Sequence, residues 1–166
     1  MKKDFFEDKK IKFPAYEPWI SDDDKKIVKK TLTQSMLTLG PQLEKFENDF
    51  CKYSKAKYAV AVSNCTAALH LSLMALGIKK DDEVIIPDLT FVADANAILA
   101  CNAKPVIVDI NKENFFLSIS NIKKNITKKT KAIIPVHIYG QVCNIEEILD
   151  VAKDNNLKVI EDCAHA

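Results

Sequence analysis

The chain has 166 residues, of which 48% are hydrophobic and 28% charged, a composition typical of a globular protein with a buried core. Its 24 basic residues are all lysines and are interspersed with 23 acidic ones, so the net charge is only +1. This balance disfavours nucleic-acid binding, because proteins that bind nucleic acids usually cluster basic residues on one face. No apolar run approaches the roughly 18 residues that a membrane span needs.

The chain opens with a polar N-terminal segment, residues 1–20, whose two prolines predict an irregular course. Ser21 follows as a candidate N-cap, and Asp24 stands three residues later, where its carboxylate can complete a capping box. This pair predicts a helix that begins after Ser21 and ends near Thr33.

A second helix is predicted from Pro41 to Tyr53. Proline suits the first helical position, where its missing N–H has no partner to lose. Leu43, Phe46 and Phe50 recur at three- and four-residue spacing, which places them on one face of this helix.

Beyond Tyr53 the pattern changes to short, β-branched apolar runs that alternate with helical stretches. Runs that are apolar on both faces indicate strands covered on both sides, and the alternation predicts an α/β fold with a mostly parallel sheet flanked by helices. The predicted strands are 58–62, 83–87, 105–109, 132–136 and 158–161, and the predicted helices are 66–76, 92–101, 119–126 and 145–155. We expect residues 21–166 to form part of one domain that is truncated at its C-terminal end, because the chain stops directly after a strand.

Ligands of parallel sheets bind beyond the carboxyl ends of the strands, so the residues there are the candidates for a site. The segment Ser63–Ala68 follows the first run and opens a helix with small and hydroxylated residues. The free amides and positive dipole end of that helix suit an anion such as phosphate. An ordinary strand-to-helix turn capped by Ser63 or Thr66 is the alternative.

Three further candidates also follow apolar runs. Phe91 could lie flat against a planar ring or could be a core residue at a helix start. Asp162, with His165 close by, could hold a cationic nitrogen or could belong to a solvated strand end. His137 could make either a turn hydrogen bond or a contact with a ligand.

Several other chemistries are disfavoured. The chain has only three glycines, so neither a G-x-G-x-x-G dinucleotide motif nor a P-loop can be written. Its five cysteines are widely spaced, without a C-x-x-C pair or a histidine at ligand spacing, so we expect neither a metal site nor a disulfide framework. The charged first ten residues lead into no apolar signal core, which predicts a cytoplasmic location.

Taken in order, the motifs of residues 13–166 resemble those of the DegT/StrS family of pyridoxal-phosphate-dependent sugar aminotransferases, whose fold is that of aspartate aminotransferase, type I. The matching stretches are 18–21, 37–41, 63–71, 82–87, 90–93, 104–106, 135–140 and 161–166. The resemblance implies that the chain is the N-terminal portion of a large domain that binds pyridoxal 5'-phosphate (PLP).

The resemblance also implies roles for individual residues. Thr66 and Ala67 are similar to the residues that hold the cofactor phosphate, and Phe91 to the aromatic residue stacked on the pyridine ring. Asp162 resembles the aspartate that pairs with the protonated ring nitrogen, and His165 the residue packed against the ring or its phenolic oxygen. None of the 24 lysines matches the family's Schiff-base lysine, so no catalytic residue is assigned within this chain.

The function implied is transfer of an amino group, from glutamate as the donor, to a keto group of a nucleotide-linked sugar for surface polysaccharide or glycan synthesis. The family resemblance further implies a homodimer with shared cofactor sites. Two alternatives stay open: a sugar dehydratase of the same fold, in which a histidine replaces the lysine, and a non-catalytic protein that binds a nucleotide sugar or a partner subunit.

Overall fold

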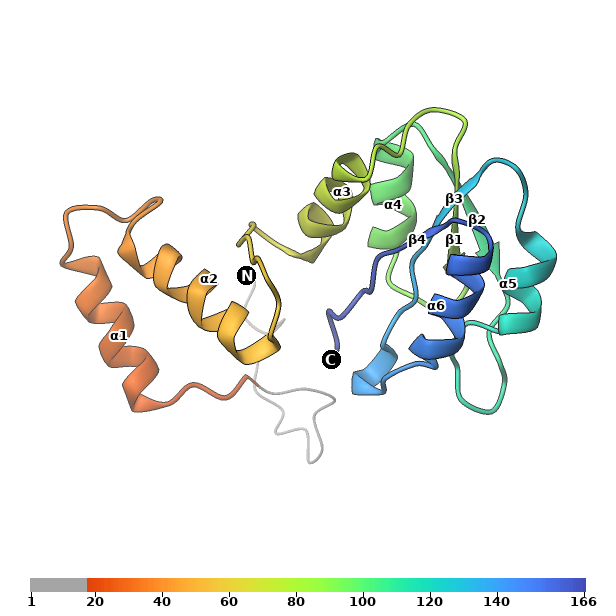
Figure 1. The fold of residues 1–166 in the computed structure, drawn as a ribbon. Helices are drawn as coiled ribbons and strands as arrows, with labels where there is room; N and C mark the ends of the chain where they lie inside the picture. The colour runs from red at the N-terminus through yellow and green to blue at the C-terminus, as the bar shows by residue number, and fades with distance from the viewer. Residues whose placement is uncertain (1–17) are drawn as a thin grey trace, which may run out of the picture. The chain divides into compact units, whose positions relative to one another are not determined.

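Figure 1 shows the chain as a computed structural model that describes residues 18–166. It divides into two compact units, one ending at Ala61 and one spanning Val62–Ala166. The helices are α1 (Asp22–Leu32), α2 (Pro41–Ser54), α3 (Cys65–Ala75), α4 (Ala93–Ala100), α5 (Ile119–Asn125), the short 3₁₀ helix η1 (Ile138–Gly140) and α6 (Ile145–Asp154). The strands are β1 (Glu83–Pro87), β2 (Lys104–Val108), β3 (Thr130–Ile133) and β4 (Lys158–Val159). The part of the predicted N-terminal segment before Pro18 lies outside the described residues.

The first unit contains α1 and α2, and both begin where the sequence predicts. The Asp24 amide donates to Ser21 Oγ at 3.2 Å, and the Ser21 amide donates back to Asp24 Oδ2 at 2.8 Å, which completes the capping box. Helix α2 starts at Pro41 after Gly40, where an added Cβ would lie 2.8 Å from the carbonyl oxygen of Met36. This close approach of two backbone segments requires glycine at position 40.

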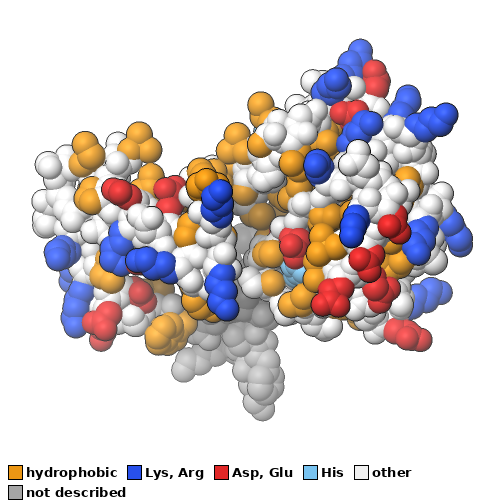
Figure 2. Space-filling view, in the orientation of Figure 1, with side chains coloured by type: hydrophobic (Ala, Val, Ile, Leu, Met, Phe, Trp, Pro, Cys, Tyr) orange, Lys and Arg blue, Asp and Glu red, His pale blue; other side chains and the backbone are white. Residues whose placement is uncertain are grey.

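Neither helix of this unit buries a side chain, and its apolar residues lie at the surface (Figure 2). Trp19 is 86% exposed and Leu39 is 87% exposed. Phe46 and Phe50 share the predicted face of α2, with ring centroids 6.2 Å apart, and both are more than half exposed. Residues 18–61 of the first unit therefore present an apolar surface and bury no hydrophobic side chain.

The second unit is built on a four-stranded parallel sheet in the order β2-β1-β3-β4, which confirms the predicted α/β fold. The chain passes from β1 to β2 through α4, crosses back to β3 through α5, and reaches β4 through α6. Because β2 and β3 lie on opposite sides of β1, the winding reverses there, and the edge beyond the carboxyl ends of β1 and β3 is where ligands of such sheets bind.

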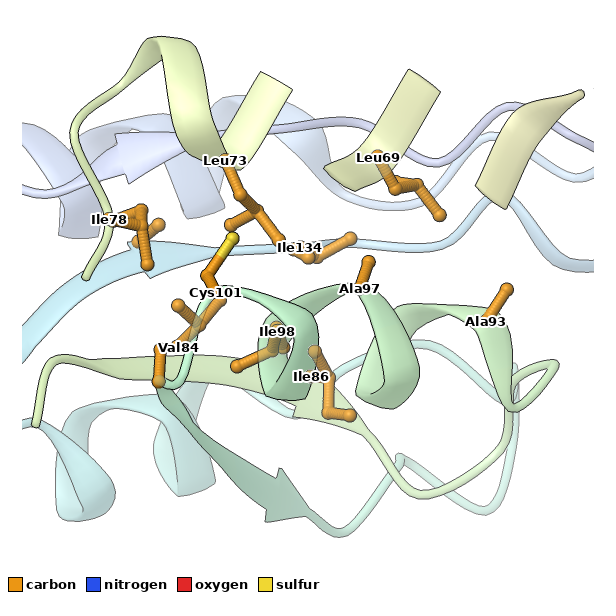
Figure 3. Close-up of a cluster of buried hydrophobic side chains, with 12 residues drawn as sticks. Leu69, Leu73, Ile78, Val84, Ile86, Ala93, Ala97, Ile98, Cys101 and Ile134 are labelled. Carbon is orange, nitrogen blue, oxygen red and sulfur yellow. The ribbon is translucent and has the colours of Figure 1, made fainter. Parts of the chain in front are cut away.

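Side chains of β1 alternate between two hydrophobic clusters. Val84 and Ile86 pack with residues of α3 and α4, among them Leu73 and Ile98, as Figure 3 shows. Ile85 points the other way, into a cluster built largely from α5 and α6. All five residues of β1 are buried, so the prediction of a strand covered on both faces is confirmed for β1.

Two predictions about strands are wrong. Residues 58–62 form no strand, because no strand in the described part of the chain lies beside them to complete a hydrogen-bonded ladder. Strand β2 forms, but it lies at the edge of the sheet and its Ile107 is 62% exposed. The prediction that β2 is covered on both faces is therefore wrong. No helix among residues 18–166 is long and apolar enough to cross a membrane.

Candidate functional site

Asp162 lies at the carboxyl edge of the sheet, just beyond β4. Its amide donates to the Pro135 carbonyl at 2.9 Å, and its own carbonyl accepts from the His137 amide at 3.1 Å. These bonds continue the pairing of β3 with β4 past the end of both strands. The backbone of Asp162 is therefore held rigidly, and its side chain is only 6% exposed.

The Asp162 carboxylate joins the start of α3 to this edge. Its Oδ1 accepts hydrogen bonds from the Cys65 thiol at 3.4 Å and from the Ala164 amide at 2.9 Å. Burial, together with the nearby Asp162 charge, raises the pKa of Cys65 to about 11, so the thiol keeps its proton and can donate. Oδ2 accepts no hydrogen bond from any residue in the described range, which leaves this oxygen available to a ligand.

Thr66 and Ala67 occupy the first turn of α3, as predicted, but their amides differ. The Ala67 amide donates to Asn64 Oδ1 at 2.9 Å, the N-cap bond of the helix. Within the described residues the Thr66 amide and hydroxyl have no such partner, and Thr66 is exposed. The Thr66 amide and hydroxyl are therefore open to a ligand at this helix end, whereas the Ala67 amide is occupied by Asn64. The N-cap is Asn64, not Ser63 or Thr66 as the alternative interpretation had it.

Phe91 lies in the loop between β1 and α4 and is 69% exposed. The alternative of a core phenylalanine is therefore wrong for the described part of the chain. A large exposed aromatic ring beside the carboxyl edge of a parallel sheet suits stacking on a planar ligand.

Asp94, one turn after Phe91, is a residue that the sequence analysis missed. It is fully buried, with Thr90 Oγ1 hydrogen-bonded to its Oδ2, and its Oδ1 has no partner in the described part of the chain. Burial raises the pKa of Asp94 to about 6, and the Asp162 carboxylate adds to this effect, although the Thr90 bond opposes it. No local signal distinguished Asp94 from a solvated helix residue, because the same helix also carries the polar Asn96.

His165 stacks on Tyr139 at the end of the chain. The two rings are nearly parallel, at 17°, with centroids 5.9 Å apart, and the Tyr139 amide donates to His165 Nδ1 at 3.4 Å. Tyr139 adopts the left-handed conformation, with φ of 54°, and at Gly140 an added Cβ would lie 3.3 Å from the His165 carbonyl oxygen. With Nδ1 occupied as an acceptor, a neutral His165 ring carries its proton on Nε2 and can donate from there.

His137 makes the turn hydrogen bond that was one of its two interpretations. Its Nδ1 accepts from the Cys143 amide at 3.1 Å, so Nε2 carries the proton and donates to Glu161 Oε2 at 3.0 Å. The side chain is buried and ties the η1 turn to the residue that precedes Asp162.

Substitution of His137 by leucine in the full-length protein is expected to lower the free energy of unfolding by about 1–3 kcal/mol, because it leaves the buried Cys143 amide unpaired. His70→Leu is the matched control, since His70 is half-buried and its ring makes no hydrogen bond within residues 18–166. Chemical denaturation of both variants measures the difference. Equal losses would show that the His137 bonds add nothing to stability.

Residues 18–166 contain no group of three or more histidine, cysteine, aspartate or glutamate side chains arranged to hold a metal ion. The five cysteines are unpaired thiols. The residues that follow the strands at this edge offer an Asp162 oxygen that no described residue binds, an exposed ring on Phe91 and a donor on His165, and the start of α3 offers Thr66. This donor set fits a planar, cationic, phosphorylated ring such as that of PLP.

Comparison with known proteins gives a consistent result. The profile of the DegT/DnrJ/EryC1/StrS aminotransferase family matches residues 18–166. The chain is 46% identical over 154 residues to a GDP-perosamine synthase of Escherichia coli O157:H7, a match that covers 92% of this chain and 42% of that protein.

Two solved structures extend the comparison. A putative sugar aminotransferase of Streptococcus pneumoniae in its PLP form is 31% identical with a TM-score of 0.87, over 93% of this chain and 43% of that one. A GDP-4-keto-6-deoxymannose-3-dehydratase is 28% identical with a TM-score of 0.84, over 90% of this chain and 40% of that one. The chain thus spans about two-fifths of the length of these relatives.

Proposed function

This chain belongs to the DegT/DnrJ/EryC1/StrS aminotransferase family, and we propose that the whole protein uses PLP to transfer an amino group from glutamate to a keto group of a nucleotide-linked sugar. The observation that carries the proposal is the Asp162 carboxylate. It is buried at the carboxyl edge of the sheet, its Oδ1 accepts hydrogen bonds from Cys65 and Ala164, and its Oδ2 has no partner among residues 18–166.

In this proposal each residue at the sheet edge has one task. Asp162 Oδ2 pairs with the protonated ring nitrogen, Phe91 covers one face of the ring, and the Thr66 amide and hydroxyl bind the phosphate. His165 donates from Nε2 to the phenolic oxygen, and Tyr139 keeps its imidazole in that tautomer. When bound, PLP supplies an electron sink for the charge released at the substrate carbon.

The substrate class is proposed from the relatives. Proteins named GDP-perosamine synthase are 42–47% identical to this chain in three bacteria, which favours a GDP-linked keto-sugar, with a role in surface polysaccharide or glycan synthesis. The dehydratase alternative also keeps support, because the structure of the GDP-4-keto-6-deoxymannose-3-dehydratase resembles this chain closely. The two differ in product: one gains nitrogen on the sugar, and the other loses a ring hydroxyl.

The test is an assay of the full-length protein with PLP and glutamate against a panel of keto-sugars linked to GDP, UDP and dTDP, followed by mass spectrometry of the products. We expect an aminated sugar and 2-oxoglutarate in equal amounts. Loss of a ring hydroxyl without amination would replace this proposal with the dehydratase. Binding of a nucleotide sugar without either reaction would favour the non-catalytic alternative.

We also propose that the functional unit is a homodimer. The apolar side chains of Trp19 and Leu39, which no residue between 18 and 61 covers, support an interface in this part of the chain. Light scattering of the full-length protein should give twice the chain mass, and Trp19→Asp should shift it toward the monomer. A fully active monomer at assay concentration would contradict this prediction.

A further inference from the structure

The buried carboxyl group of Asp94 has no role in the function proposed so far. It is 0% exposed, and among residues 18–166 only one of its two oxygens has a hydrogen-bond partner, the Thr90 hydroxyl. An ionised carboxylate with one bare oxygen is costly in such a place, whereas the protonated acid leaves only a weak acceptor unpaired. Burial accordingly raises the pKa of Asp94 to about 6.

The groups that act electrostatically on Asp94 come from two other elements. Asp162 beyond β4 raises the pKa of Asp94. Both carboxyl groups in turn raise the pKa of the Cys65 thiol at the start of α3. The two carboxyl groups differ in hydrogen bonding and in access to a ligand. Asp162 receives two hydrogen bonds on one oxygen and has its other oxygen free for a ligand, while Asp94 is enclosed. Environments that differ in this way separate two neighbouring acids into one that is charged and one that holds a proton.

Resting on the proposed function, we propose that Asp94 is a positioning residue of the cofactor site that holds a proton beside Asp162 and releases it to solvent when a cationic ring nitrogen pairs with Asp162. The physical reason is that a positive charge placed next to Asp162 lowers the cost of a second negative charge nearby. By reciprocity, the ionised Asp94 holds the cationic ring more tightly. The charge of the site is thereby linked to pH through a residue that does not touch the ring nitrogen itself.

The experiment measures proton release by titration calorimetry of the full-length protein with pyridoxamine 5'-phosphate, at pH 6, in buffers of different ionisation enthalpy. A matched probe is the 1-deaza analogue, in which a ring CH replaces the cationic nitrogen. If the cation lowers the pKa of Asp94 by about one unit, pyridoxamine phosphate should release about 0.4 proton more than the analogue. This comparison requires no substitution, so it does not depend on the folding of a variant.

Asp94→Asn should abolish the excess release and weaken binding of pyridoxamine phosphate about ninefold at pH 7 but only about twofold at pH 5, since asparagine mimics the protonated acid. The control is Glu83→Gln, which removes a buried carboxyl bonded to Thr127 and Lys104 at the opposite end of β1 and should leave the release unchanged. Equal release with both probes, or an excess that survives in Asp94→Asn, would overturn the role of Asp94 while leaving the proposed function intact. Absence of any saturable binding to the unsubstituted protein would instead overturn the proposed function, and this role with it.

Discussion

Asp162→Asn in the full-length protein is expected to lower kcat by about 100-fold or more, the effect of removing a preorganised charge from an active site. Asparagine matches aspartate in shape, and its amide oxygen can still accept hydrogen bonds from the Cys65 thiol and the Ala164 amide. These two donors lie 3.4 and 2.9 Å from Asp162 Oδ1. What it lacks is the negative charge that favours a protonated ring nitrogen, and each pKa unit lost there is about 1.4 kcal/mol. Steady-state kinetics with glutamate and the accepted keto-sugar measure the loss.

Cofactor binding should be weakened but still detectable in this variant, because the substitution leaves the proposed phosphate and ring contacts of Thr66 and Phe91 in place. Asp109→Asn is a suitable control, since Asp109 also follows a strand but is exposed and lies past the edge strand β2. We expect it to retain normal turnover. A turnover of Asp162→Asn that is near that of the control would show that Asp162 does not pair with the ring nitrogen.

Ile86→Ala is expected to destabilise the protein by about 2–5 kcal/mol, the usual cost of truncating a buried aliphatic side chain and leaving a cavity. Ile86 is 1% exposed and belongs to the buried cluster of Figure 3, which also contains residues of α3 and α4. The loss should appear as a lower denaturation midpoint in urea or guanidinium.

Ile107→Ala provides the control for this substitution. Ile107 is the residue paired with Ile86 in the ladder between β1 and β2, so residue type and position along the strand are matched, whereas β1 is central and β2 lies at the edge. Because Ile107 is 62% exposed, its truncation should change stability by no more than about 0.5 kcal/mol. An equally large loss for Ile107→Ala would show that another part of the full-length protein covers this face of β2.

Features that depend on neighbours in sequence were predictable. The capping box of Ser21 and Asp24, the start of α2 at Pro41 and the central strand β1 all formed as expected. Each rests on contacts within a few residues or on a run of apolar side chains long enough to reveal its burial. The order in which strands and helices alternate then sufficed to predict a parallel sheet.

The site was predictable only in part. Asp162 and Phe91 could be proposed because candidate residues follow strands in this class of fold, and their roles remain proposals. The burial of Asp94, the bond from Cys65 to Asp162 and the stacking of Tyr139 on His165 could not be read from the sequence. Cys65 and Asp162 are 97 positions apart, and nothing local to either residue indicates the other.

The sequence by itself determined where helices begin, the order in which strands and helices alternate in the second unit and which family the chain resembles, because capping, periodicity and motif order are local properties of the chain. Tertiary structure alone decided that β2 is an edge strand, that residues 58–62 pair with no described strand and that His137 serves a turn. It also decided that Asp94 is enclosed beside Asp162. The physical reason is the same in each case: burial, strand pairing and the pKa of an acid depend on which distant segments become neighbours, and that is settled only when the whole unit packs.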